Sequence, residues 1–309
     1  MKTLSLAKSL ATAISVASVL FTGSIAAQHA QSAAAVRPRV GFSIVKTSKV
    51  AVAERLLIPG GSYSKKIDTN FSAFLIKHDK DYLLFDTGLG AKIDAQYEQD
   101  MPYWQRPFFK FDRPVVPARK QLDDAGFAPI QKVIVSHSHW DHAGGVLDFP
   151  EASIFASQDE MSTIAQPHPG AGGTWASQVS HASIHWKPIV FLPVAYRGYA
   201  QSLDLFNDGS VVLVPMPGHT AGSIGMFVTV DSGKTYFFIG DVAWKAVAVE
   251  MGAPKFLAAS VIVDRDRDQT LASVEKVRSV VSQYPELVVV PAHDGAVQDA
   301  LGYFPSWVR

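Results

Sequence analysis

The sequence predicts an α/β protein built as a four-layer αβ/βα sandwich, in which two sheets pack face to face between outer helices. A hairpin pattern at residues 74–88, with two strands around a charged turn and an aspartate after the second strand, recurs at residues 226–241. Each copy is followed by a helical segment and then by an apolar strand that ends in histidine. With 309 residues and 48% hydrophobic content, the chain can bury a large core.

The two copies are also spaced alike. Asp86 stands 51 positions before His137, and Asp241 stands 52 positions before His293. A single match can be coincidence because hairpins are common, but equal offsets to a histidine indicate an internal duplication. Strand ends from both halves of such a sandwich meet along one edge, so we expect the histidines and Asp241 to gather there.

The first half contains strand, hairpin and helix patterns in turn. The aromatic-rich segment 91–116 carries prolines at positions 102, 107 and 114, and we expect it to be a loop because it is too broken for a long helix. Around it we expect one or two strands in 41–57, hairpin strands at 71–77 and 82–85, a helix at 117–125 and a strand at 133–135.

The second half repeats these patterns after a less regular stretch. We expect a strand at 153–156, a helix ending at Ala165, a loop at 166–180, strands at 211–214, 223–230, 235–239 and 287–291, and an amphipathic helix at 268–283. His168, His181 and His185 have no partner at ligand spacing, and His78 stands in a hairpin turn, so we interpret all four as surface residues.

Residues 1–35 have a different composition and are interpreted as a secretory signal peptide. Lys2 and Lys8 precede an uncharged stretch of Ala, Ser, Val and Leu, and small residues near its end offer cleavage sites. An uncleaved membrane anchor is the alternative, but the most apolar part, residues 14–21, is too short for a stable span. The sequence has no cysteine, which excludes disulfides and lipidation at the cleavage site. We therefore expect residues 36–309 to form one domain in the bacterial periplasm or outside the cell.

The segment V-I-V-S-H-S-H-W-D-H-A-G-G at 133–145 places four potential metal ligands within six positions. His137 and His139 are two residues apart, so an extended backbone points both imidazoles the same way. Asp141 and His142 follow in a turn and can face a second point nearby. A polar loop with solvated histidines and Asp141 as an N-cap is the alternative, but imidazole and carboxylate without thiolate suit Zn²⁺, Fe or Mn²⁺. A site short of protein ligands keeps water on the metal, as hydrolases do.

With G-H-T at 218–220, G-D at 240–241 and the late His293, the sequence resembles the metallo-β-lactamase-fold hydrolase superfamily over residues 40–309. D-T-G at 86–88 also matches a recurrent element of that family. The resemblance implies one zinc ion held by His137, His139 and His219, a second held by Asp141, His142 and His293, and Asp241 bridging the two.

Such a pair of cations shares a water, lowers its pKa towards neutrality and presents a metal-bridging hydroxide to the substrate. The resemblance therefore implies a dinuclear zinc-dependent hydrolase, in which Fe or Mn can occupy the same ligands. Asp141 and Asp241 are the expected catalytic residues, and Asp141 is also placed to relay a proton to the leaving group. Asp86 and Asp294 are candidates for orienting a ligand imidazole, or else turn residues with local backbone bonds.

The resemblance leaves several substrates open, because members of the family cleave β-lactams, thioesters, acyl-homoserine lactones and organophosphates. A bridging Asp241 fits lactonases, glyoxalase II-like thioesterases and phosphotriesterase-like members. The lack of cysteine excludes β-lactamases with a zinc-bound thiolate, and Val242 stands where the other β-lactamase subclass is expected to carry serine.

The S-H-S-H-W-D-H-A-G-G segment, and A-H-D followed by F-P-S-W at 304–307, are most similar to the acyl-homoserine lactonase branch. That branch usually has a tyrosine three positions after the bridging aspartate. This chain has Trp244 there, whose indole N–H can donate a hydrogen bond but cannot act as an acid. We expect an ester or a lactone to be cleaved, with a β-lactam, a thioester or a phosphotriester as the alternatives.

Aromatic residues are expected to line the substrate pocket. Trp244 and three residues of the aromatic segment, Tyr103, Trp104 and Phe108, are the predicted substrate-binding residues, with Trp175 and Trp186 as further candidates. The alternative is an aromatic cluster that packs the loop onto the core. A pocket of this composition suits a small molecule with an apolar group.

Two other classes of function are disfavoured. The formal net charge is zero, the pI is about 7.2 and no basic run occurs, so we expect no nucleic-acid partner. A non-enzymatic metal-binding protein is the remaining alternative, but a closed structural site has no need of seven ligands around two positions that leave room for water.

Overall fold

Two mixed sheets organise residues 39–309, the part of the chain that the computed structural model describes. The first sheet has the strand order β1 (Val40–Ala53), β2 (Lys66–His78), β3 (Asp81–Phe85), β4 (Lys132–Ile134), β5 (Ser153–Ser157) and β6 (His185–Ile189). The second has the order β11 (Val288–Val290), β10 (Thr235–Phe238), β9 (Ile224–Thr229), β8 (Val211–Pro215) and β7 (Leu203–Asp204). The expected signal peptide at 1–35 lies outside the described residues.

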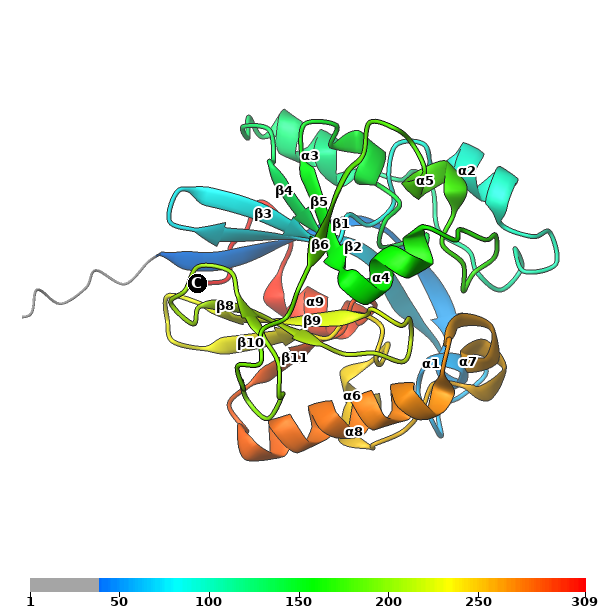
Figure 1. The fold of residues 1–309 in the computed structure, drawn as a ribbon. Helices are drawn as coiled ribbons and strands as arrows, with labels where there is room; N and C mark the ends of the chain where they lie inside the picture. The colour runs from blue at the N-terminus through cyan, green and yellow to red at the C-terminus, as the bar shows by residue number, and fades with distance from the viewer. Residues whose placement is uncertain (1–38) are drawn as a thin grey trace, which may run out of the picture. The chain divides into compact units, whose positions relative to one another are not determined.

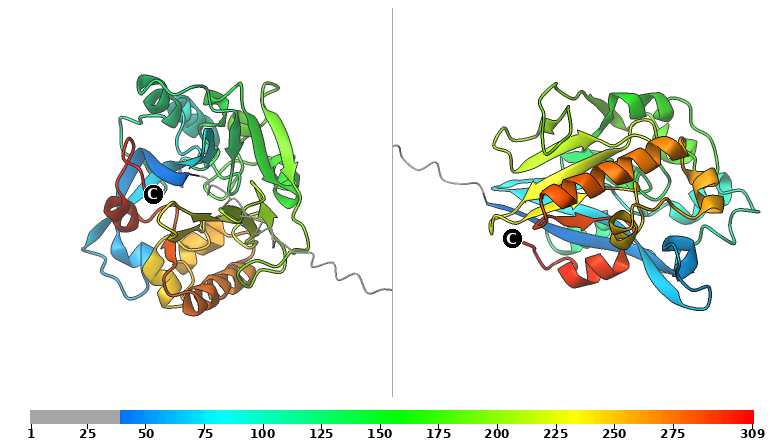
Figure 2. Two further views of the ribbon diagram at one scale, coloured as in Figure 1. Left: turned by 90° about the vertical axis from the view of Figure 1, so that its left-hand side faces the viewer. Right: turned by 90° about the horizontal axis from the view of Figure 1, so that it is seen from below.

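Helices cover the outer faces of the two sheets (Figure 1). The helices of the first half are α1 (Glu54–Leu57), α2 (Ile93–Asp100), α3 (Ala118–Asp124), α4 (Gln158–Ile164) and α5 (Ala176–Val179), with a short 3-10 helix at Val146–Asp148. Those of the second half are α6 (Ala246–Glu250), α7 (Leu257–Val263), α8 (Arg267–Gln283) and α9 (Gly295–Leu301). Figure 2 shows α8 lying across the five-stranded sheet. Among residues 39–309, no helix combines the length and the apolar character needed to cross a membrane.

The main core lies between the sheets, as the alternating apolar residues of their strands require. Phe42, Phe74 and Phe85 of the first sheet meet Met226 and Phe238 of the second. The ring of Phe238 lies 5.1 Å from that of Phe42 and 4.9 Å from that of Phe74, both edge to face. Two further apolar clusters lie under α3 and α4 on one outer face and under α8 on the other. The four layers predicted from the sequence are therefore present.

The strand pairings repeat in the two halves. In each half, three successive strands pair antiparallel and a fourth joins the third in parallel, through β1 to β4 and again through β8 to β11. The segment between the third strand and the fourth is helical in both halves, with α2 and α3 in the first and α6, α7 and α8 in the second. His137 is the third residue after β4 and His293 the third after β11. The duplication thus places equivalent histidines at equivalent strand ends.

Several short elements differ from the sequence expectations. Residues 93–100 of the expected aromatic loop form α2, since the three prolines all follow this helix and Ile93 and Tyr97 bury one side of it. The expected loop at 166–180 contains the four-residue helix α5. Strand β6 was missed because its sequence contains Pro188, which an edge strand tolerates. Helices α6, α7 and α9 have too few residues for a clear apolar period.

Candidate active site

The residues predicted to hold metal come together from strand ends of both sheets. Ligand atoms lie within 4.8 Å of one another in three groups: His137, His139 and His219; His137, His142 and Asp241; and Asp141, His142 and His293. Asp241, in the second group, lies between the first group and the third. Its Oδ1 lies 3.3 Å from His142 Nε2 and 3.1 Å from His293 Nε2, and its Oδ2 lies 3.5 Å from His219 Nε2. All seven predicted residues are therefore in one cluster.

Three of the imidazoles are oriented by an oxygen that accepts from Nδ1. His142 donates to Asp86 Oδ2 at 2.8 Å, and His219 donates to Asp264 Oδ1 at 2.7 Å. His293 donates to the backbone oxygen of Asn70 at 2.7 Å. Because Nδ1 of each ring donates a hydrogen bond to one of these oxygens, Nε2 is the nitrogen that faces the cluster.

His137 is oriented through a serine. Ser136 Oγ donates to Asp86 Oδ2 at 2.9 Å and lies 3.0 Å from His137 Nδ1, so its oxygen accepts a hydrogen bond from that nitrogen. Asp86 thus orients both His137 and His142. Orienting a ligand imidazole was one of the two roles that the sequence suggested for this residue. Asp294 does not contact an imidazole, because its side chain accepts the backbone N–H of Ala296 and Val297 and caps α9.

The cluster has the donors that two cations require. His139 Nδ1 and His219 Nε2 are 2.9 Å apart, and the Nε2 atoms of His142 and His293 are 3.3 Å apart. Nitrogen ligands around one zinc ion, with bonds of about 2.0–2.1 Å, have separations of this size. Asp241 Oδ1 and His137 Nε2 are buried without a hydrogen-bond partner, which is costly unless a cation satisfies them. The residues present therefore fit a pair of metal ions.

The charges of the cluster differ between its two ends. Burial and the neighbouring imidazoles hold the pKa of His137 and the pKa of His139 well below their ordinary value. Burial also lowers the pKa of His142 and of His293, but nearby carboxylates outweigh it: Asp86 and Asp241 raise the pKa of His142 well above its ordinary value, and Asp241 with Asp141 raises that of His293 to about 9. At pH 7, the end of the cluster with His137 and His139 is therefore neutral, and the end with His142 and His293 carries positive charge.

Asp241 and Asp264 stay ionised for the same reason. Burial raises the pKa of Asp241, but His293 and His142 lower it by more, so it lies well below its ordinary value. Burial likewise raises the pKa of Asp264, and the hydrogen bond from His219 and the charge of Lys255 outweigh that effect. Both carboxylates are thus available as anions to the imidazoles.

Glu160 on α4 is a site residue that the sequence analysis missed. It is fully buried and accepts from Ser138 N at 2.7 Å, Ser138 Oγ at 2.5 Å, Thr220 Oγ1 at 2.6 Å and Gly222 N at 3.2 Å. Ser138 stands between His137 and His139, and Thr220 follows His219. One carboxylate therefore ties together the loops that carry three ligands. In the sequence, S-Q-D-E at 157–160 matches only a capping box, which is a local helix signal.

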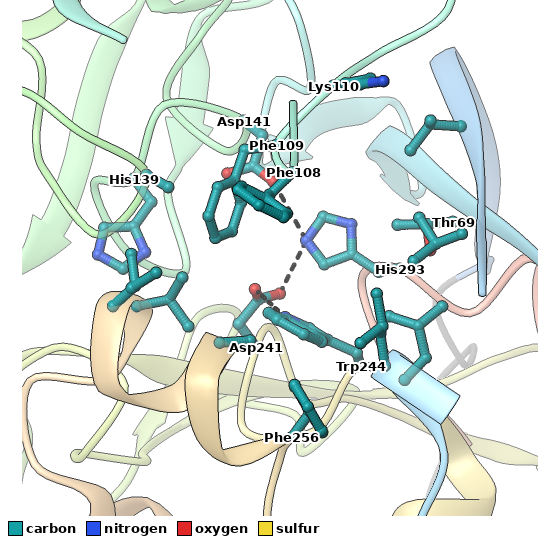
Figure 3. Close-up of a pocket in the computed structure, with 18 of the residues that line it drawn as sticks. Thr69, Phe108, Phe109, Lys110, His139, Asp141, Asp241, Trp244, Phe256 and His293 are labelled. Carbon is teal, nitrogen blue, oxygen red and sulfur yellow. Dashed lines mark hydrogen bonds and ion pairs between the residues drawn. The ribbon is translucent and has the colours of Figure 1, made fainter. Parts of the chain in front are cut away.

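The cluster opens into a cavity of about 320 Å³ with apolar walls (Figure 3). The walls come from Val50 to Leu57, from residues 108–110 and from residues 256–263 around α7. His139, Asp141, His219, Asp241 and His293 line its inner end. Within the described part of the chain, Lys110 is the one charged lining residue outside the ligand cluster. A small molecule with an apolar group fits these walls.

The predicted substrate-binding residues separate into two sets. Trp244 and Phe108 line the cavity, and Phe109 joins them. Tyr103 and Trp104 are 83% and 53% exposed and do not line it, which corrects their expected place: the turn after Pro102 directs both outward. Trp175 and Trp186 also lie outside the lining. Trp175 is buried and stacks on Trp140, and the indole of Trp186 donates to Val179 O.

Trp244 makes a contact that the sequence did not indicate. Its indole Nε1 donates to Asp241 Oδ2 at 2.8 Å. The N–H that was expected to reach substrate therefore holds the carboxylate that lies between the two metal-ligand groups. Of the cavity-lining residues in the described part of the chain, none is a tyrosine.

This chain is similar to known proteins in sequence and in fold. N-acyl homoserine lactonase AttM of Agrobacterium fabrum is 27% identical over 230 residues, which cover 72% of this chain and 80% of AttM. The structure of an N-acyl homoserine lactone hydrolase with N-hexanoyl-L-homoserine at its catalytic metal center superposes with a TM-score of 0.66 at 15% identity, covering 88% of this chain and 100% of that one. The dizinc lactonase AidC superposes with a TM-score of 0.56 at 18% identity, covering 83% and 88%.

The sequence profile of the Metallo-beta-lactamase superfamily matches residues 70–293, a range that contains every residue of the ligand cluster. This match extends over most of the chain and agrees with the two-sheet sandwich and with the histidines at its edge. The protein therefore belongs to the metallo-beta-lactamase superfamily, as a metal-dependent hydrolase.

Proposed function

We propose that the protein is a dinuclear zinc hydrolase that opens a lactone or cleaves an ester, and that its substrate carries an apolar group. The observation that carries this proposal is the position of the two ligand groups at the inner end of an apolar cavity. The names of AttM and of the lactone hydrolases with the same fold support a lactone as the substrate class.

The roles of the residues follow from their places. Two zinc ions bound here would lower the pKa of a shared water and polarise the substrate carbonyl. We assign His137, His139 and His219 to one ion, Asp141, His142 and His293 to the other, and Asp241 to both. The Asp141 side chain is 12% exposed at the cavity surface, with Oδ2 3.3 Å from His293 Nε2, so it can pass a proton towards the leaving group.

A second candidate substrate is an aryl ester or a phosphotriester, whose leaving group needs no proton. The contact between Trp244 and Asp241 favours it, because this indole is already engaged and no tyrosine among residues 39–309 lines the cavity. In that case, kcat/KM should rise steeply as the pKa of the leaving group falls. Equal rates for alkyl lactones and aryl esters of matched acyl length would count against this candidate.

Hydrolysis assays on zinc-loaded protein test the main proposal. The substrates are N-acyl homoserine lactones and p-nitrophenyl esters of increasing acyl length, with a thioester, a β-lactam and a phosphotriester for comparison. We expect kcat/KM for lactones to rise with acyl length until the cavity is filled, because each buried methylene contributes about 0.8 kcal/mol. Rates that do not depend on chain length would contradict an apolar substrate group.

A pair of variants on α7 locates the binding surface. Ile262 lines the cavity, whereas its neighbour Val261 is 63% exposed. Ile262→Ser should lower kcat/KM for long acyl chains about tenfold, with little effect on the shortest one, since part of a buried aliphatic contact is lost. Val261→Ser is the control and should leave both values unchanged. Equal effects of the two variants would contradict binding in this cavity.

We further propose that residues 1–35 direct export to the periplasm or the medium. The basic start, the apolar stretch and the small residues before position 36 support this. Fractionation of cells that express the whole chain should yield a periplasmic or secreted product beginning near residue 36. A full-length cytoplasmic product would contradict export.

A further inference from the structure

Residues 255–264 belong both to the cavity wall and to the metal-ligand cluster. Phe256, Ala259 and Ile262 line the cavity. Asp264, which directly follows α7, accepts the hydrogen bond of His219 Nδ1 at 2.7 Å. The apolar wall and the group that orients a ligand imidazole are therefore within one short stretch of chain.

Asp264 is held tightly at this position. Lys255 Nζ donates to its Oδ1 at 2.6 Å, and Ser260 Oγ donates to its Oδ2 at 2.5 Å. The side chains of Lys255 and Asp264 are 3% and 1% exposed. The backbone continues the attachment, since the N–H of Arg265 donates to His219 O at 2.9 Å. A change in the position of His219 must therefore change the positions of residues 255–264.

A second link joins the same segment to Asp241. The ammonium of Lys255 lies 5.7 Å from the ring of Trp244, and the indole of Trp244 donates to Asp241 Oδ2. Residues 255–264 thus connect to His219 through Asp264 and to Asp241 through Trp244. His219 and Asp241 both face the metal position assigned to His137, His139 and His219.

Apart from these contacts, α7 packs on the protein mainly through its last two residues, because Ile262 and Val263 pack in the apolar cluster that contains Trp140 and Trp175. Its seven residues bury only Ser260 and Val263, while Leu257 and Val261 are more than half exposed. A helix this short is not stable without tertiary contacts. The order of the cavity wall therefore depends both on this packing and on the contacts that Asp264 and Lys255 make with the ligand cluster.

We propose that Asp264 is a positioning residue that couples the His137, His139 and His219 metal position to the apolar wall of the cavity. Zinc binding there fixes His219 and with it residues 255–264, so zinc and an apolar ligand each bind more tightly when the other is present. This coupling rests on the proposed function, in that the cluster must bind zinc.

Hydrogen exchange of the wild-type protein tests the coupling without any variant. Zinc should slow amide exchange of residues 255–264 at least tenfold relative to the metal-free protein, together with exchange of the 137–142 loop. Slowed exchange at 137–142 without a change at 255–264 would overturn the coupling and leave the proposed function standing. Failure of zinc to bind at all would overturn both, and this is visible in the same measurement.

Reciprocity gives a second readout, with the neutral apolar dye N-phenyl-1-naphthylamine as the cavity ligand. Zinc should lower the Kd of the dye about fivefold or more, and the dye should tighten zinc binding by the same factor. Dye binding that is indifferent to zinc would contradict the proposal.

Two matched variants separate positioning from a merely structural role. Lys255→Met removes the buried ammonium but keeps the Asp264 carboxylate on His219. The double variant Lys255→Met with Asp264→Ala also removes the carboxylate, and neither variant leaves an unpaired buried lysine. Chelator competition should give the double variant a zinc affinity about 10- to 100-fold weaker at one position than that of Lys255→Met, which keeps the carboxylate. Equal zinc affinities in the two variants would refute the role of Asp264.

Discussion

The five imidazoles of the site differ in their protonation when no cation is bound. His137 and His139 are kept neutral by burial and by their neighbours, whereas the pKa of His142 and that of His293 are raised by adjacent carboxylates. In the metal-free protein, protons at the second pair therefore compensate the charges of Asp86, Asp141 and Asp241. A cation that binds there must displace these protons.

Zinc binding should accordingly depend on pH. Because the pKa of His293 is about 9 and that of His142 is raised, binding near pH 7 should release about one proton or more, and zinc affinity should rise with pH up to about 9. Calorimetry in buffers of different ionisation enthalpy measures the release. Proton release near zero at pH 7 would contradict this charge distribution.

The same shift has the opposite effect on the metal-free fold. The folded-state pKa of His293 lies above the unfolded value of about 6.5, so its contribution to stability is complete below pH 6.5 and is lost as the pH rises through about 9. Denaturant titration of the metal-free protein should show the free energy of unfolding decline over this pH range. Added zinc should reverse this decline.

Asp241 is the residue whose loss should be most damaging to the site. It lies between the two ligand groups, and Asp241→Ala removes the one carboxylate that contacts both of them. Activity should disappear, and zinc content measured by plasma mass spectrometry should fall by at least one ion per chain. Asp124→Ala, at an exposed ion pair with Lys120, is the control and should change neither value. Full zinc content in Asp241→Ala would remove this residue from the site.

Trp244 should act through Asp241 rather than through the substrate. Trp244→Phe keeps an apolar ring but removes the indole N–H that donates to Asp241 Oδ2. Zinc affinity should fall about tenfold, as for the loss of other outer partners of metal ligands. Trp186→Phe removes an indole N–H that donates to Val179 O away from the cavity, and should leave zinc affinity unchanged. Unchanged zinc affinity in Trp244→Phe as well would return the indole to a role in substrate binding.

At the scale of secondary-structure elements, α4 fixes the relative positions of two ligand loops. Glu160, near its start, accepts four hydrogen bonds from Ser138, Thr220 and Gly222. The close approach of Gly222 explains why glycine is needed there: an added Cβ would lie 2.1 Å from Glu160 N. Three ligands therefore depend on one helix that contributes no ligand itself.

Glu160→Gln tests this dependence. The amide places a donor where a carboxylate oxygen accepted, so at least one buried donor loses its partner, at a cost of about 1–3 kcal/mol of unfolding free energy. Zinc affinity should fall with it. Glu275→Gln, in a half-exposed pair with Arg278, should change the unfolding free energy by less than about 0.5 kcal/mol. Denaturant titration measures both, and equal values would contradict the role of Glu160.

The helices and strands that could be predicted from sequence are those with a clear period or a clear boundary. The hairpins around residues 74–88 and 226–241 and helix α8 have such patterns. The role of Glu160 could not be predicted, because its carboxylate accepts hydrogen bonds from residues 22 and 60 positions away. In the sequence, the same residue looks like a helix cap.

At the scale of the whole molecule, duplication explains why the site could be located. Strands β4 and β11 are each the fourth strand of the repeated unit and pair in parallel with its third strand, and the histidines after them belong to one cluster. The spacing of Asp86, His137, Asp241 and His293 in the sequence carries this information. The seven predicted ligands therefore form one cluster.

The cavity was less accessible to prediction, since three segments far apart in sequence build it. Residues around Leu57, Phe109 and Ile262 share no period or motif, and the tertiary fold brings them together. Composition alone did not distinguish Phe108, which lines the cavity, from Tyr103 and Trp104, which face outward. Side-chain direction in an irregular loop depends on the tertiary fold.

Anomalous diffraction at the zinc edge, on crystals of zinc-loaded protein, tests the central claim most directly. We predict two peaks about 3.5–4 Å apart, one beside His137, His139 and His219, the other beside Asp141, His142 and His293, with Asp241 between them. A single peak, or peaks away from these residues, would contradict the dinuclear site.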